Sequence, residues 1–407
     1  MKPIKIKFVM FLVALLFLLF FSNDFGLIDI EKTAIITAVA IDYTEDNQYE
    51  LTAQVAVPEA TDSNPENAKA HVSGKGGTMG AAFKDLGDVS GWYPNLNFCN
   101  LIILGGEFKD KNVINVLDYF GRTLRVQDSA LVVFSESKAK DVLNVSSPLD
   151  NISSFAIQKI LFKNPGFDME VAKMDIKNFT VGYYSRGKSS FMPVIKTIDE
   201  EGSSSSGGQG SSGGGGEMTG GQSSGGTSSN NTQKKKFFNA KTTALFKNGI
   251  KVGELDQSLT TTHNIITSSF EGSTLEIKNV DFKGENKNFL ITIYRNTPKI
   301  TLTADQNNLN LNISLDIFCR ISDQNTEGAE NTLVTNKPLL KEVKEKAESQ
   351  LSADIKNLID VSKATDCDFL NLTDKLYRRC NKYYYTYKDN CLSKMKTNIT
   401  VTVQGQK

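Results

Sequence analysis

The N-terminus combines a basic start with a long run of apolar residues. Fourteen helical residues rise only about 21 Å, which is short of a hydrocarbon core of about 30 Å. Lysine side chains that reach back to the interface lengthen such a span. We therefore expect residues 1–25 to be an uncleaved membrane anchor, with the bulk of the chain outside the cytoplasm. A cleaved signal peptide and a buried core helix stay open as alternatives. The residues that define the anchor are Lys2, Lys5, Lys7, Phe8 and Phe21.

Beyond the anchor, the apolar pattern alternates between a period of two and a period of three to four. A polar turn at residues 45–47 separates two alternating segments, which is typical of a β-hairpin. Because strands and helices are interleaved, we expect one α+β or α/β domain over residues 26–201. The predicted strands are residues 35–42, 49–57 and 129–134, and the predicted helices are residues 78–89 and 112–120.

Residues 202–233 differ sharply in composition, because glycine and serine dominate and almost nothing is apolar. Such a composition is typical of a flexible linker. We expect this linker to separate two folded halves.

The second half again shows clear periodicity. Alternation over residues 309–317 predicts a long strand, and residues 399–403 predict a final strand. After Pro338, apolar residues at three- and four-residue steps predict an amphipathic helix. We divide this half into a middle domain (234–297) and a C-terminal α+β domain (298–407). The apolar stripe of the helix is Leu339, Leu340, Val343, Ala347, Leu351, Ile355 and Leu358.

These elements predict an α+β fold class: an N-terminal membrane anchor, then three mixed α/β domains with antiparallel or mixed sheets. Forty-six basic and forty-six acidic residues cancel. The balance gives no reason to expect a nucleic acid as partner. The hydrophobic content of 39% is that of folded globular domains.

Several enzyme motifs match by letter but lack the required context. Matches to G-x-G-x-x-G and G-x-S-x-G lie inside the Gly/Ser segment, where no strand precedes and no helix follows. Residues 182–189 satisfy the P-loop pattern, ending in Lys188 and Ser189. Pro193 follows closely and disfavours the helix that a P-loop needs. We therefore expect no nucleotide, no cofactor and no catalytic residue.

Cysteine and histidine give no metal-site pattern. The two histidines, His71 and His263, have polar, turn-prone neighbours, and we expect both at the surface. The five cysteines contain no C-x-x-C pair, so we expect no metal site. A disulfide among the last three and unpaired thiols are both open alternatives. The cysteines are Cys99, Cys319, Cys367, Cys380 and Cys391.

A tyrosine cluster near the C-terminus is a candidate partner interface, since tyrosine is enriched at interfaces. A half-buried helix face is the alternative. The cluster consists of Tyr383, Tyr384, Tyr385 and Tyr387.

The order of these segments resembles the Ger(x)C family of spore germination proteins. Residues 29–42 are similar to the opening strand of that family, which carries "TALGID". Residues 100–107 resemble its "K-x-I-I-I-G-E" strand, and residues 244–253 its "A-V-F-K-x-x-K-L-V-G" segment. No one motif is specific, but their order and spacing cover nearly all of the chain after residue 29.

Three departures from the family pattern stand out. The lipobox cysteine that usually follows the apolar run is absent, and so are the tryptophans common near the family's C-terminus. Residues 368–373 stand where relatives carry a glycine-bearing "D-I-F-G-F-G" stretch, which puts that turn in doubt.

The resemblance implies a non-catalytic, membrane-associated subunit of a spore germinant receptor. It would act through protein–protein contacts with two membrane-embedded subunits, one of them transporter-like, on the outer face of the inner spore membrane. A different class of function, an extracytoplasmic solute-binding or cell-envelope adhesion protein, is the alternative. A P-loop NTPase is a third.

Overall fold

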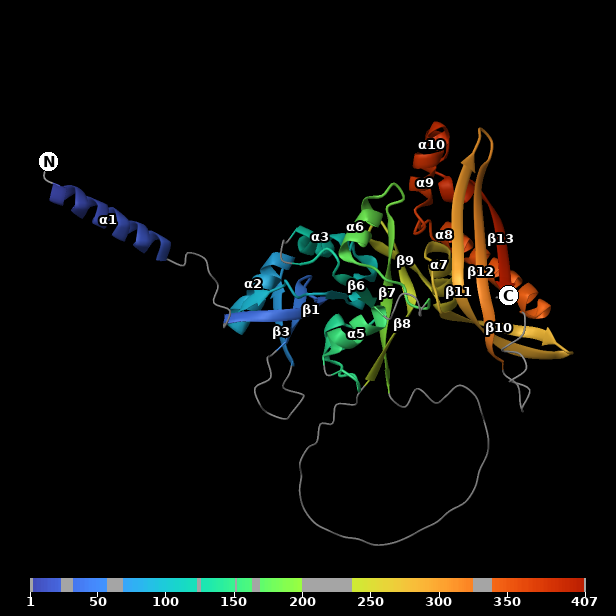
Figure 1. The fold of residues 1–407 in the computed structure, drawn as a ribbon, viewed down its shortest axis with the longest axis horizontal. Helices are drawn as coiled ribbons and strands as arrows, with labels where there is room; N and C mark the ends of the chain where they lie inside the picture. Colours follow the sequence, from blue (N-terminus) through green and yellow to red (C-terminus); the bar gives the residue numbers. More distant parts are fainter. Residues whose placement is uncertain are drawn as a thin grey trace, which may run out of the picture.

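The fold is described from a computed structural model, which covers residues 3–22, 32–56, 69–122, 126–150, 152–162, 169–199, 236–324 and 339–405. Two β-sheets with helices packed on them make up the body, and helix α1 (Pro3–Ser22) lies apart from it (Figure 1). Across the residues so described, no helix meets both the length and the apolarity that crossing a membrane demands. The side chains of the predicted anchor residues Lys2, Lys5, Lys7 and Phe21 lie outside the described part of the chain.

The centre of the larger sheet consists of parallel strands. β1 (Thr33–Tyr43), β5 (Leu101–Leu104), β6 (Leu131–Ser135) and β7 (Ser189–Asp199) pair in this order. Every residue of β5 and β6 is buried. Parallel strands with both faces covered have such continuous apolar sequences.

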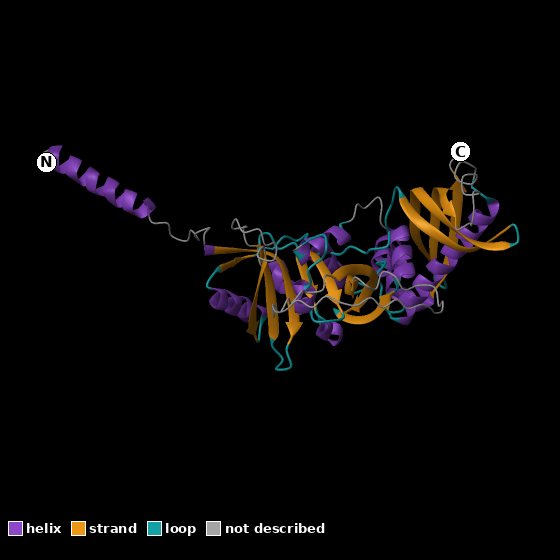
Figure 2. Cartoon of the chain, turned by 90° about the horizontal axis from the view of Figure 1, so that it is seen from below, coloured by secondary structure: helices purple, strands orange, loops and turns teal. Residues whose placement is uncertain are grey.

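Helices cover both faces of this sheet (Figure 2). One face of β5 and β6 packs in a cluster with the first set of helices, and the other face packs with the second set. The first set is α2 (Met79–Ser90), α3 (Ile114–Arg122) and α6 (Ile176–Tyr184), and the second is α4 (Ala139–Asn144) and α5 (Ser153–Leu161). A short 3₁₀ helix (Gly106–Asp110) follows β5.

Antiparallel strands flank the parallel centre on one side. β2 (Tyr49–Ala56) pairs with β1, and β3 (Lys69–Gly76) pairs with β2. The predicted hairpin is thereby confirmed, with Asn47 at a φ of 57° in its turn. A three-residue strand, β4 (Tyr93–Asn95), runs parallel to the start of β1.

On the other side, the sheet continues with strands that follow the Gly/Ser segment in the sequence. β8 (Lys236–Lys247) pairs antiparallel with β7, so that Asp199 lies opposite Lys236, and β9 (Ile250–Leu255) pairs with β8. The expectation that residues 202–233 separate two folded halves is therefore wrong, because the segment joins two neighbouring strands of one sheet. Residues 202–233 themselves lie outside the described residues.

The second sheet has four strands. β10 (Ser273–Phe282), β11 (Glu285–Ala304) and β12 (Leu309–Gln324) form an antiparallel meander, and β13 (Met395–Gly405) pairs parallel with β12. Helix α8 (Lys341–Ala364) packs against β13 and β10. Buried and half-exposed residues alternate along β12, as its sequence predicts. The expected domain boundary at residue 297 falls inside β11, so it cuts through a continuous strand.

The remaining helices connect the two sheets. Helix α7 (Gln257–Thr267) contacts β8, β11 and α8. A single apolar cluster includes Leu245 of β8, Leu255 of β9, Ile266 of α7 and the inner face of the second sheet. The short helices α9 (Leu372–Arg379), α10 (Asn381–Tyr387) and α11 (Cys391–Lys394) lead back to β13. The fold class is thus mixed α+β, as predicted, and its strands form two sheets.

Candidate functional site at the junction of the two sheets

The loop that matches the P-loop pattern has the reverse order of elements. Helix α6 precedes it and strand β7 follows it, whereas a P-loop runs from a strand into a helix whose N-terminus faces the phosphates. The Ser189 hydroxyl donates a hydrogen bond to the carbonyl of Gly187 (2.8 Å). This loop is therefore not a P-loop.

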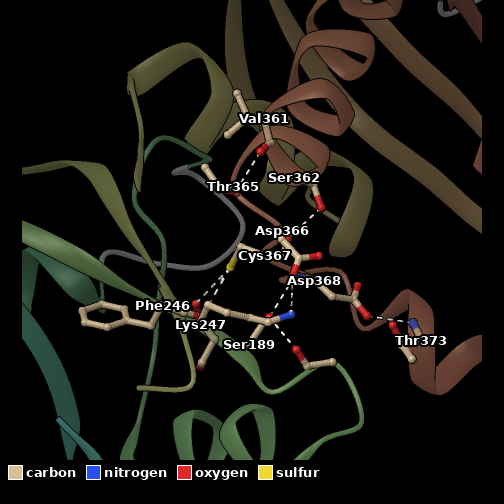
Figure 3. Close-up of polar contacts among 12 residues, drawn as sticks. Ser189, Phe246, Lys247, Val361, Ser362, Thr365, Asp366, Cys367, Asp368 and Thr373 are labelled. Carbon is tan, nitrogen blue, oxygen red and sulfur yellow. Dashed lines mark hydrogen bonds and ion pairs between the residues drawn. The ribbon is translucent and has the colours of Figure 1, made fainter. Parts of the chain in front are cut away.

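The same loop instead receives the segment that follows α8 (Figure 3). The backbone N–H of Asp368 donates to Ser189 Oγ at 2.9 Å. The Cys367 thiol donates to the carbonyl of Phe246 in β8 at 3.3 Å. Residues 365–374, which we call the junction segment, thereby join β7 and β8 to the C-terminal helices.

Asp368 organises the junction segment from inside. Its carboxylate accepts hydrogen bonds from the N–H groups of Leu372 and Thr373, both at 2.7 Å, at the start of α9. Burial raises the pKa of this carboxyl, and the hydrogen bonds from Thr373 and Leu372 oppose that rise. Backbone N–H groups thus satisfy both carboxyl oxygens of Asp368, as the N-terminus of a helix allows.

The turn that the family comparison put in doubt does form. Asn371 adopts a φ of 55° and precedes the first residue of α9. Asparagine is, after glycine, among the residues that best tolerate this left-handed conformation. The resemblance places Asn371 at a glycine of the family stretch, and the left-handed conformation is adopted here by asparagine.

Gly187 permits the close approach of the two segments. A Cβ at this position would lie 2.7 Å from Asp368 Oδ2 and 2.9 Å from Asp368 Cβ. Any larger residue must push the junction segment away from the α6–β7 loop. Close packing against the junction segment therefore explains why a glycine stands at position 187, within the match to the P-loop pattern.

Ion pairs line the rim of the junction. Lys247 Nζ lies 3.3 Å from Asp366 Oδ2, and Arg186 Nη1 lies 3.0 Å from Asp374 Oδ1. The Arg186 guanidinium also lies over the Tyr377 ring, 3.5 Å from its centroid. These pairs are partly exposed, so each contributes little on its own.

The cysteine of the junction segment is not a reactive nucleophile. Burial raises the pKa of the Cys367 thiol to about 12, so the thiolate is not populated near neutral pH. All five cysteines, each within the described part of the chain, carry free thiols, and the unpaired alternative holds. Among the described residues, no group of three histidine, cysteine or acidic residues is arranged to hold a metal ion.

A second buried carboxylate lies where parallel α/β sheets commonly bind ligands, at the carboxyl ends of the central strands. Asp42 is the last residue but one of β1, and its carboxylate accepts hydrogen bonds from the N–H groups of Ala139 (2.6 Å) and Lys140 (2.9 Å). Desolvation raises its pKa to about 6. A Cβ at Gly105 would collide with the Asp42 carboxylate. The backbone at Gly105 therefore occupies the space beside this carboxylate.

The histidine prediction is wrong for His263. This residue of α7 is buried, and desolvation lowers its pKa to about 4, so the ring is neutral. Its ring packs edge-on against Phe191 and Phe369. His71 is half-buried beside Gln54, 3.1 Å from its Nε2. Sequence patterns missed the burial because the neighbours of His263 are polar.

The tyrosine cluster divides between core and surface. Tyr387 is buried and its hydroxyl donates to the carbonyl of Asp305 (3.0 Å). Tyr383 and Tyr384 are partly buried against the core, and Tyr385 is 77% exposed. The partner interface at these residues stays a prediction.

Two hollows adjoin α7. A cavity of about 240 Å³ is lined by Phe191, His263 and Phe270 together with α5 residues. A second, of about 560 Å³, lies between α7, α8 and β10 and has Asp256, Asp354 and Glu276 in its lining. Burial, and then the charge of Asp256, raises the pKa of Asp354.

Comparisons with known proteins agree with this architecture. Residues 27–197 match the family model "Spore germination protein N-terminal domain", and residues 241–406 match "Spore germination B3/ GerAC like, C-terminal". The crystal structure of the GerBC protein is similar with a TM-score of 0.53 at 17% identity, covering 91% of this chain and 97% of that one. That likeness shows a common fold.

The spore germination protein B3 of Bacillus subtilis is 31% identical over 125 residues. The matched stretch covers 30% of this chain and about a third (33%) of that protein. Two matched domains in family order define a spore germination protein of the C-subunit type. The chain belongs to the Ger(x)C family.

Proposed function

We propose that this protein is a non-catalytic, membrane-attached subunit of a spore germinant receptor. It promotes nutrient-triggered germination through contacts with membrane-embedded receptor subunits. The observation that carries the proposal is the pair of family domains, which together reach from residue 27 to residue 406. Helix α1 lies before both and provides the attachment.

The surface chemistry of α1 supports attachment to a membrane. Apolar side chains from Phe8 to Phe17 are exposed around the helix, among them Phe11 at 66%. An exposed helix that is apolar on all sides gains free energy by entering lipid. The lysines that precede the apolar run, Lys2, Lys5 and Lys7, favour a cytoplasmic start, which leaves the two sheets outside the cytoplasm.

The state of the buried polar groups supports a role in contact rather than catalysis. The Asp368 and Asp42 carboxylates accept backbone hydrogen bonds, and the Cys367 thiol is protonated. Each of these groups holds one part of the chain to another. A catalytic acid, base or nucleophile would need access to a substrate.

Complementation of a spore-forming strain tests the function. In a strain that lacks the gene, the full chain should restore germination in response to nutrients, and a chain without residues 1–31 should not. The truncated chain should accumulate in soluble form, which separates lost attachment from lost folding. Equal germination with and without the full chain would refute the receptor role.

A further inference from the structure

Four exposed apolar side chains lie within residues 89–98, between the end of α2 and the start of β5. Val89 ends the apolar positions of α2, and Trp92 and Tyr93 lead into β4. Phe98 follows in the loop before β5. Their exposed fractions are 66%, 50%, 57% and 56%. We call these four residues the aromatic patch.

Strand pairing fixes the patch beside the start of β1. Tyr93 lies opposite Thr33, the first residue of that strand. The N–H of Asn100, two residues after Phe98, donates to the carbonyl of Thr37 (3.1 Å). The patch thus lies beside the start of β1, the first strand after α1 in the sequence, and in Figure 1 α2 and β1 lie at the end of the body nearer to α1.

The chain is short between the helix and the patch. Only residues 23–31 separate the end of α1 from Lys32. Even fully extended, this connection reaches about 35 Å. If α1 is held in a membrane, the patch therefore stays close to the bilayer surface.

The patch has the chemistry of a membrane interface. Tryptophan and tyrosine place an apolar ring toward the acyl chains and a polar atom at the headgroup level. Lys32, exposed and next to the residue that pairs with Tyr93, adds a cation that suits lipid phosphates. Several large apolar side chains exposed together mark an interaction site.

From this placement we propose that the aromatic patch rests on the phospholipid bilayer at headgroup depth, so that the first sheet touches the membrane beside α1. The proposal rests on the proposed attachment through α1. It assigns to the first sheet a second, peripheral contact with lipid that orients the body relative to the membrane.

Trp92 is the single tryptophan of the sequence, so its fluorescence reports the patch alone. The full chain is reconstituted into phospholipid vesicles that carry quenchers either near the headgroups or deep in the acyl chains. We expect the Trp92 emission to shift to the blue and to lose most intensity with the shallow quencher. Aqueous iodide should quench it weakly.

A matched variant places the probe far from the patch. Tyr385 on α10 is exposed and belongs to the second sheet's helices. In a chain with Trp92→Phe and Tyr385→Trp, iodide should quench strongly and the lipid quenchers should have no effect. Both substitutions are at exposed aromatic positions, so folding is retained.

Vesicle flotation separates the two levels of the proposal. A chain that floats with vesicles but keeps Trp92 accessible to iodide and insensitive to lipid quenchers overturns the patch contact, while attachment through α1 stands. A chain that does not float overturns the attachment and the patch contact with it. Shielding of Trp92 only when membrane-embedded subunits are present would assign the patch to a protein and overturn the lipid contact.

Discussion

Strands β5 and β6 of the larger sheet bury every side chain, whereas β12 of the second sheet buries every other one. Helices cover both faces of β5 and β6, but α8 covers one face of the second sheet. For the same number of residues, β5 and β6 therefore contribute more buried side chains than β12 does. A parallel strand with helices on both faces has no face that tolerates polar substitution. A strand with helices on one face tolerates polar substitution on its other face.

This difference predicts where substitutions have the largest effect. Ile102→Ala and Ile103→Ala, neighbours on opposite faces of β5, should each lower the free energy of unfolding by about 2–5 kcal/mol. On β12, Ile313→Ala should cost as much, and Ser314→Ala should change stability by less than about 0.5 kcal/mol. Urea unfolding measures all four. A small cost at either β5 position would break the comparison.

The junction between the two regions should be sensitive to added volume. Gly187→Ala should lower stability by about 1–3 kcal/mol, since the new Cβ meets Asp368. Gly77→Ala is the matched control, because a Cβ there has no neighbour within 4 Å. Thermal and chemical unfolding of the two variants gives the difference. Equal stability of both would show that the junction segment is not tightly held.

Removal of the Gly/Ser segment tests whether the strands on its two sides belong to one sheet or to two independently folded halves. Deleting residues 202–233 leaves four residues between Asp199 and Lys236, which are paired across β7 and β8. Shortening the loop from 36 residues to four should stabilise the protein by about 2 kcal/mol through a smaller closure entropy. Chemical denaturation measures the gain. Unchanged unfolding of two independent units would contradict the continuous sheet.

The smallest expected effect is a pH dependence from Asp42. Its folded pKa of about 6 lies above the ordinary value of 3.8, so the folded state holds the proton more tightly than the unfolded state. This contribution to stability is complete below about pH 4 and is lost as the pH rises through about 6, by about 1 kcal/mol between pH 5 and 7. Asp42→Asn should reduce that dependence, measured by urea unfolding at both pH values. The same slope in both proteins would refute the assignment.

Sequence periodicity predicted those elements whose pattern is regular. The β1–β2 hairpin and the stripe of α8, with Val343, Leu351 and Leu358 buried, follow from local spacing. It did not predict the junction, because Ser189 and Asp368 are 179 residues apart and each is an ordinary polar residue locally. Only the fold brings them together.

Helix α7 shows why burial can escape a sequence pattern. Its residues 260–266 are all buried although most are polar. Thr261 and Thr262 donate their hydroxyls to carbonyls four residues earlier, and Asn264 donates to Met169 and Val171. Polar side chains satisfied in this way can be buried at little cost, so hydropathy alone placed His263 at the surface.

Co-purification from spores tests the central claim most directly. A tagged full chain is extracted from spore membranes in mild detergent, beside a chain without residues 1–31 as control. The account predicts that membrane-embedded germinant receptor subunits are recovered with the full chain. Recovery of the full chain from the membrane fraction without any receptor subunit would contradict it.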